Sequence, residues 1–208
     1  MDFPREIGEN PYRHPTVKPH HFDIENVRSR CQRTFEIFLA SKAVADQWLH
    51  PEDIGTEGGL WNNELLVGRH QQNAEKDISQ NLLELAVNVR VLEDTLKGNS
   101  HFAKRLSQMR SYHGTMMAWF IGEGREDMRE LCNKIIHAQD IRPEYDESAE
   151  VDEGTIWALN GLVLLSGERG KSQWQVQFDA LEFLEAVFEM TTWVSPFLEQ
   201  DYEPESDD

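Results

Sequence analysis

The spacing of hydrophobic residues predicts helices over the first part of the chain. From residue 22 to residue 49, apolar side chains recur at helical intervals, and Asp23 is placed to cap the first turn. A second helix is predicted from about Asn73 to Lys97, followed by a basic amphipathic helix from His101 to Tyr112. The Gly98-Asn99 pair separates these two helices, as glycine and asparagine commonly do at a helix end.

The predicted helix over residues 73–97 carries apolar residues on two sides. Its main stripe repeats every three or four residues and consists of Ile78, Leu82, Leu85, Val89, Leu92 and Leu96. A lesser stripe of Leu83, Val87 and Val91 lies opposite, so we expect both sides to be covered, as in a central bundle helix. Glu84 and Arg90 flank the lesser stripe, where a charged group needs either a salt-bridge partner or water, and a structural salt bridge is the simpler interpretation for each.

The pattern changes after Pro143. Residues 144–153 are mostly acidic and predict a solvated loop. An apolar stretch from Trp157 to Leu165 and a strictly alternating stretch from Gln173 to Phe178 then predict two strands joined in a hairpin. A final helix is expected from about Asp179, ending before Pro196.

These elements predict a mainly α fold, namely a helical bundle with one antiparallel β-hairpin at about residues 155–178 near the C-terminus, an α+β arrangement. The 208 residues suit a single helical domain, expected over 22–198. Four prolines in residues 1–21 predict an extended N-terminal arm, and six acidic side chains in residues 199–208 predict an acidic disordered tail.

Charge is distributed unevenly along the chain. Residues 1–139 hold 20 acidic and 17 basic side chains, whereas residues 140–208 hold 18 acidic and 3 basic ones. The net charge of −18 argues against a nucleic-acid binder for the whole chain, although the first two thirds alone do not exclude one. The acidic C-terminal third instead favours a basic protein partner.

Compartment and cofactor expectations follow from what the sequence contains. Cys31 and Cys132 lie among apolar residues, which predicts buried free thiols and a reducing, cytoplasmic setting. No run of residues approaches the length of a membrane span. His14, His20 and His21 have no further ligands at a metal-site spacing, so neither a metal nor another cofactor is expected.

The residues with potential chemistry lie on a short helix predicted over about 126–139. Arg129, Asn133 and His137 fall on its polar side, and the last two are stacked neighbours at positions i and i+4. A solvated helix face with a surface histidine is the simpler interpretation. The chemical interpretation needs a second group near His137, for which Arg90 and Glu84 are the other candidates.

The run from Cys132 to His137 resembles the Arg-polar-x-x-x-His motif of HEPN domains, with Cys132 at the position of the family's arginine. HEPN domains are helical bundles, often dimeric, and many are metal-independent ribonucleases of toxin–antitoxin and phage-defence systems, while others are inactive scaffolds. Residues 75–190 are also similar, in the order of their motifs, to uncharacterised bacterial proteins of this general type. Cys132 projects onto the apolar side of the helix, so we expect it in the core.

Two hypotheses follow. In the first, the protein is HEPN-like and binds or cleaves RNA as a homodimer whose 126–139 helices face each other. Any enzyme activity would then be that of a metal-independent ribonuclease, with His137 as acid and base, Asn133 orienting it or the phosphate, and Arg129 or Arg90 as the cationic group that holds the phosphate. In the second, the protein is a non-enzymatic antitoxin, immunity or anti-defence factor that binds a basic partner through its acidic C-terminal third.

Overall fold

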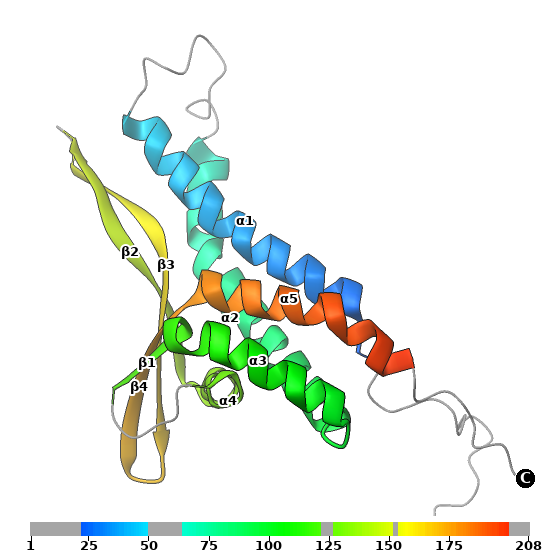
Figure 1. The fold of residues 1–208 in the computed structure, drawn as a ribbon. Coiled ribbons are helices and arrows are strands. Elements are labelled where there is room, and N and C mark those ends of the chain that lie inside the picture. The colour runs from blue at the N-terminus through cyan, green and yellow to red at the C-terminus, as the bar shows by residue number, and fades with distance from the viewer. Residues whose placement is uncertain (1–21, 50–63, 122–126, 152–153, 200–208) are drawn as a thin grey trace, which may run out of the picture.

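All the strands of the described chain lie in one antiparallel sheet, and the helices pack on one side of it (Figure 1). The structure, a computed structural model, describes residues 22–49, 64–121, 127–151 and 154–199. The prediction of a mainly helical α+β fold is confirmed. The predicted N-terminal arm, and all of the predicted acidic tail except Glu199, lie outside the described residues.

Four of the five described helices follow a polar capping residue. The five are α1 (Ile24–Leu49), α2 (Glu64–Thr95), α3 (Ser100–Met117), α4 (Met128–His137) and α5 (Ala180–Glu199). The side chains of Asp23, Asn99, Asp127 and Asp179 each accept a hydrogen bond from the backbone N–H three residues later, at 2.8–3.0 Å. Such caps satisfy backbone donors that the first helical turn leaves open, typically by about 1 kcal/mol each.

The sheet is larger than the predicted hairpin. Its strands are β1 (Ala118–Ile121), β2 (Asp140–Val151), β3 (Gly154–Arg169) and β4 (Ser172–Asp179), in the spatial order β1-β4-β3-β2. Both predicted strands are present as β3 and β4, with β2 and β1 added at the two edges. The apolar residues just before Gly122 are divided between the end of α3 and β1.

The prediction of a loop over residues 144–153 is wrong, because most of this segment belongs to β2. Pro143 is buried, and Ile141 and Tyr145 pack against the core, so every second residue of the strand's first half faces the helices. The acidic residues between and after them hide this alternation in the sequence. Burial of one side of the strand therefore outweighs its acidic composition.

The core lies between the covered side of the sheet and the helices. Phe178 of β4 meets Phe183 of α5 edge to face, with ring centroids 6.0 Å apart. Every member of the main stripe of α2, from Ile78 to Leu96, is buried. One connected cluster of buried side chains includes residues from all five helices and from β3 and β4.

Three helix predictions differ from the structure. Helix α2 begins at Glu64, nine residues before the predicted start. Its lesser stripe is not covered, because Leu83 and Val87 are 38% and 42% exposed. Helix α5 continues through Pro196 to Glu199, since Val194 is buried and Leu198 packs on the core beyond the point where proline removes one backbone hydrogen bond.

The β2–β3 hairpin continues beyond the rest of the sheet. β4 pairs with β3 only from Leu162 to Arg169, whereas β2 pairs with β3 from Gly154 to Ser166. The two strands therefore form a two-stranded ribbon, residues 144–151 and 154–161, past the end of β4 (Figure 1). We call this segment the acidic ribbon, because residues 143–160 contain six acidic side chains and no lysine or arginine.

Candidate functional site

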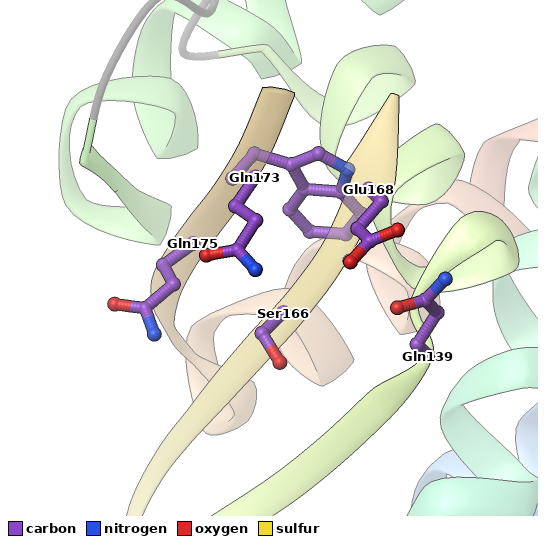
Figure 2. A pocket seen from close by; sticks show the side chains of 7 residues that line it. Gln139, Ser166, Glu168, Gln173 and Gln175 are labelled. Carbon is purple, nitrogen blue, oxygen red and sulfur yellow. The ribbon is translucent and has the colours of Figure 1, made fainter. Parts of the chain in front are cut away.

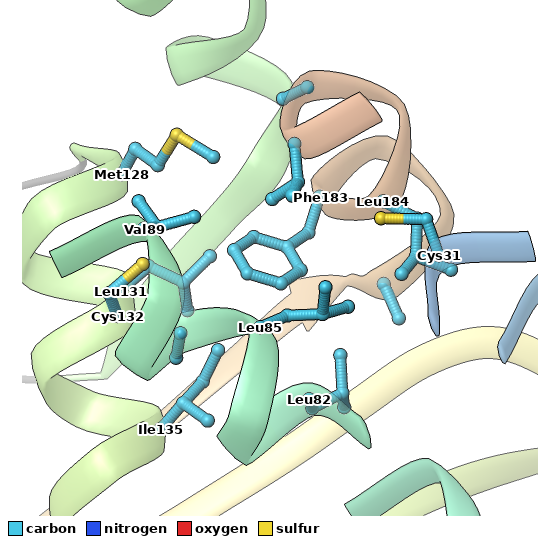
Figure 3. Close-up of a cluster of buried hydrophobic side chains, with 14 of the residues drawn as sticks. Cys31, Leu82, Leu85, Val89, Met128, Leu131, Cys132, Ile135, Phe183 and Leu184 are labelled. Atoms are coloured by element: carbon cyan, nitrogen blue, oxygen red, sulfur yellow. The ribbon is translucent and has the colours of Figure 1, made fainter. Parts of the chain in front are cut away.

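The predicted site helix is α4, and its apolar side is fixed in the core. Met128, Leu131, Cys132 and Ile135 are buried and point toward Val89 and Leu85 of α2 (Figure 3). Cys132 has no exposed surface, as expected from its position on the apolar side. The side chain at the position of the family's arginine is thus part of the packing and cannot reach a substrate.

The polar side of α4 holds the three predicted site residues in different surroundings. His137, the last residue of the helix, is exposed, and Asn133 is half-buried. Arg129 is 39% exposed and binds two carboxylates of α2, with Nη1 2.8 Å from Glu93 Oε2 and Nη2 3.0 Å from Asp94 Oδ1. Arg129 therefore joins α4 to the end of α2 and does not lie beside His137.

Arg90 is bound to the same two carboxylates. Its guanidinium lies 3.4 Å from Glu93 and 3.5 Å from Asp94. The Glu93 side chain is only 3% exposed, so its charge is stabilised by the arginines around it. The pKa of the exposed Asp94 carboxyl lies below its usual range, mainly because Arg129 donates a hydrogen bond to it.

This two-arginine, two-carboxylate cluster has no net charge. A phosphate bound by Arg90 or Arg129 would compete with Glu93 and Asp94 for the guanidinium, and loss of either arginine contact would weaken the stabilisation of the buried Glu93 charge. The cluster therefore favours a structural role for both arginines. The contacts of Arg90 could have been predicted from the sequence, since Arg90, Glu93 and Asp94 have i, i+3 and i+4 spacing.

Glu84 is also part of a structural ion pair. Its carboxylate pairs with Arg30 of α1 and accepts a hydrogen bond from Gln80 at 3.0 Å. The structural salt bridges expected for Glu84 and Arg90 are thus confirmed. Of the five candidates, only Asn133 and His137 have no side-chain hydrogen bond or ion pair to other residues that the structure describes.

A polar pocket of about 440 Å³ opens close to the end of α4, where β3 turns into β4. Gln139, Glu168 and Gln173 surround it, together with Ser166, Gly167, Trp174 and Gln175 (Figure 2). The Lys134 ammonium lies 4.3 Å from the centroid of the Trp174 ring, and a side chain at Gly167 would collide with that ring. The indole is therefore packed between its neighbours, and the pocket offers mainly amide and carboxylate groups.

Within the described ranges, no three His, Cys, Asp or Glu side chains are grouped to hold a metal ion. His14, His20 and His21, at which no metal was expected, lie outside those ranges. None of the helices in the described chain is both long and apolar enough to cross a membrane. Cys31 and Cys132 are buried, and burial raises the pKa of the Cys31 thiol to about 12.

Comparisons of the chain with protein-family models, with curated proteins and with solved structures found no match.

Proposed function

We propose that the protein is a non-enzymatic interaction protein of the cytoplasm that binds a basic protein partner, as an antitoxin, immunity or anti-defence factor does. The observation that carries this proposal is the acidic ribbon, which extends past the end of β4 and belongs to a stretch of sequence, residues 143–160, with six acidic residues and no lysine or arginine. A charge of one sign on a projecting element attracts a partner of the opposite sign and orients its approach.

The state of the predicted catalytic residues supports the same proposal. Both arginines that would hold a phosphate are bound to Glu93 and Asp94, and Cys132 is in the core. These contacts give Arg90 and Arg129 a role in stability that needs no substrate.

The proposal is tested by two variants with the same change in charge. One carries Glu144→Gln, Asp146→Asn and Glu147→Gln in the acidic ribbon. The control carries three substitutions on the helices, namely Glu36→Gln, Asp77→Asn and Glu185→Gln. Tagged parent and variants are used to capture partners from host extract, and each captured protein is then purified and titrated against all three by calorimetry.

We expect a basic partner that binds the parent and the control equally, loses affinity for the ribbon variant, and binds more weakly as salt rises from about 50 to about 200 mM. Equal affinity for the ribbon variant and the control would contradict the proposal, because only net charge would then matter.

RNA binding or cleavage by a HEPN-like homodimer is a second candidate. It is supported by the exposed His137 and by the exposed apolar pair Leu83 and Val87. This pair shares a side of α2 with Arg90 and with Asp94, and Asp94 binds Arg129 of α4, so the pair lies on the surface that borders α4. Burial of such a pair between two copies would favour the predicted two-fold dimer.

A nuclease assay on labelled RNA tests the catalytic part of this second candidate. We expect the parent to cut RNA without added metal and His137→Ala to lose at least about a hundredfold in rate if the histidine is the acid and base. Lys97→Ala, a change of an exposed residue in the turn between α2 and α3, is the control. Equal cleavage by the parent and His137→Ala would exclude His137 as the catalytic group.

A further inference from the structure

The acidic ribbon carries an exposed tryptophan beside a carboxylate. Trp157 of β3 is 49% exposed, the largest side chain among the exposed hydrophobic residues of the described chain. Its direct cross-strand partner on β2 is Glu147, which is also exposed. Side chains of directly opposed residues lie on the same side of an antiparallel pair, with Cβ atoms about 5 Å apart.

Glu147 differs from Glu144 and Asp146 in its contacts with the residues that the structure describes. Glu144 accepts a hydrogen bond from Gln177 at 2.8 Å, and Asp146 accepts one from Asn160 at 3.0 Å. Glu147 forms neither a hydrogen bond nor an ion pair with the residues that the structure describes. The ribbon thus presents one indole and one uncompensated carboxylate side by side.

We propose that the Trp157–Glu147 pair is the docking point for an arginine side chain of the basic partner. A guanidinium is planar and weakly hydrated, so it can stack on an indole face while its N–H groups donate to a carboxylate. Lysine has a compact, strongly hydrated charge and gains less from stacking. The inference rests on the proposed function and specifies which residues of the ribbon contribute most to it.

Charge argues against the other possible occupants of this surface. A second copy of the chain that used the same surface would bring acidic residues against acidic residues, because the sequence of residues 143–160 contains no lysine or arginine. A nucleic acid or an anionic membrane surface would be repelled for the same reason. An exposed aromatic residue with a charged neighbour is typical of the few interface positions that account for most of the binding energy.

The inference is tested with a fluorescent peptide of six Arg-Gly repeats, titrated against the full chain and followed by anisotropy at low salt. A peptide of six Lys-Gly repeats has the same charge and tests the preference for arginine. The variants are Trp157→Ala and Glu147→Gln. Phe35→Ala, which truncates an aromatic residue that is 44% exposed on α1, and Glu168→Gln, which neutralises an exposed acid near the β3–β4 turn, are the matched controls.

We expect Trp157→Ala to weaken binding of the arginine peptide about tenfold, equivalent to about 1.4 kcal/mol. Glu147→Gln should weaken it several-fold, both controls should stay within about twofold of the parent, and the lysine peptide should bind the parent more weakly than the arginine peptide. In a ¹⁵N spectrum, the indole N–H signal of Trp157 should shift on addition of the arginine peptide. This measurement on the parent keeps the test valid if Trp157→Ala fails to fold.

Two results would overturn the inference while leaving the proposed function in place. One is equal binding of the arginine peptide to the parent and to Trp157→Ala. The other is self-association of the parent in sedimentation that Trp157→Ala abolishes, because the surface would then belong to a second copy. Failure of the parent to bind either basic peptide at low salt would count against both the inference and the proposed function.

Discussion

Replacement of Arg129 by alanine should destabilise the protein because it removes the main partner of a buried carboxylate. The Arg129–Glu93 contact at 2.8 Å is a charge-assisted hydrogen bond to a side chain that is 3% exposed, and Arg90 remains as the other cation at 3.4 Å. Loss of one partner of a buried ion pair typically costs about 3–5 kcal/mol. Arg129 is itself 39% exposed, so solvent screens part of this interaction, and we expect a loss of about 2–3 kcal/mol.

The size of this loss separates a structural role of Arg129 from a phosphate-binding one. The free energy of unfolding is measured by urea titration followed by circular dichroism, and a loss of about 2–3 kcal/mol corresponds to a fall in melting temperature of roughly 4–12 °C for a chain of this size. Arg142→Ala is the control, because it removes an exposed pair with Asp140 at 2.7 Å that should be worth at most about 1 kcal/mol. A change of less than about 0.5 kcal/mol for Arg129→Ala would refute the structural argument.

Three other consequences of the structure can be measured directly. Gly167→Ala should lower the free energy of unfolding by about 1–3 kcal/mol, because the added methyl group collides with the rigid Trp174 ring. In the control Gly98→Ala the methyl group meets no atom within 4 Å, so equal losses for the two variants in a urea titration would contradict this account. Burial and the nearby Glu75 raise the pKa of Tyr145 to about 12, so the free energy of unfolding should fall as pH rises from about 10 to about 12. The fall should be less steep in Tyr145→Phe, and identical pH profiles for the parent and this variant would exclude Tyr145 as the cause. Cys31 and Cys132 are buried, so both should react with a thiol reagent only after unfolding, and fast labelling of the native protein would show that the core is open at α1 or α4.

Local patterns in the sequence were sufficient to predict most of the elements. Capping by Asp23, the main stripe of α2 and the alternation from Gln173 to Phe178 each depend on neighbouring residues only. The acidic β2 could not be recognised in this way, because its strand structure depends on pairing with β3 and on burial of Pro143. Local composition favoured a loop, and tertiary packing determined the result.

The candidate site was predicted only in part for the same reason. Periodicity placed Arg129, Asn133 and His137 on the polar side of one helix and Cys132 in the core, as the structure has them. Which charges meet across two helices depends on how the helices pack, so the pairing of Arg129 with Glu93 and Asp94 could not be derived from spacing. The exposure of Trp157 is another long-range result, since it requires β4 to end before it reaches this part of β3.

The strand order also bears on the sequence of events in folding. β2, β3 and β4 are joined by short connections, so their pairing brings together residues that are close in the chain. β1 pairs with β4 at Ala118 and Phe178, with α4 and two strands between them in sequence, and closing this much longer loop costs more chain entropy. We therefore expect the antiparallel strands β2, β3 and β4 to pair first and β1 to join the edge of β4 after α4 has packed. β1 would then be the last strand of the sheet to become ordered, together with the end of α3 that precedes it.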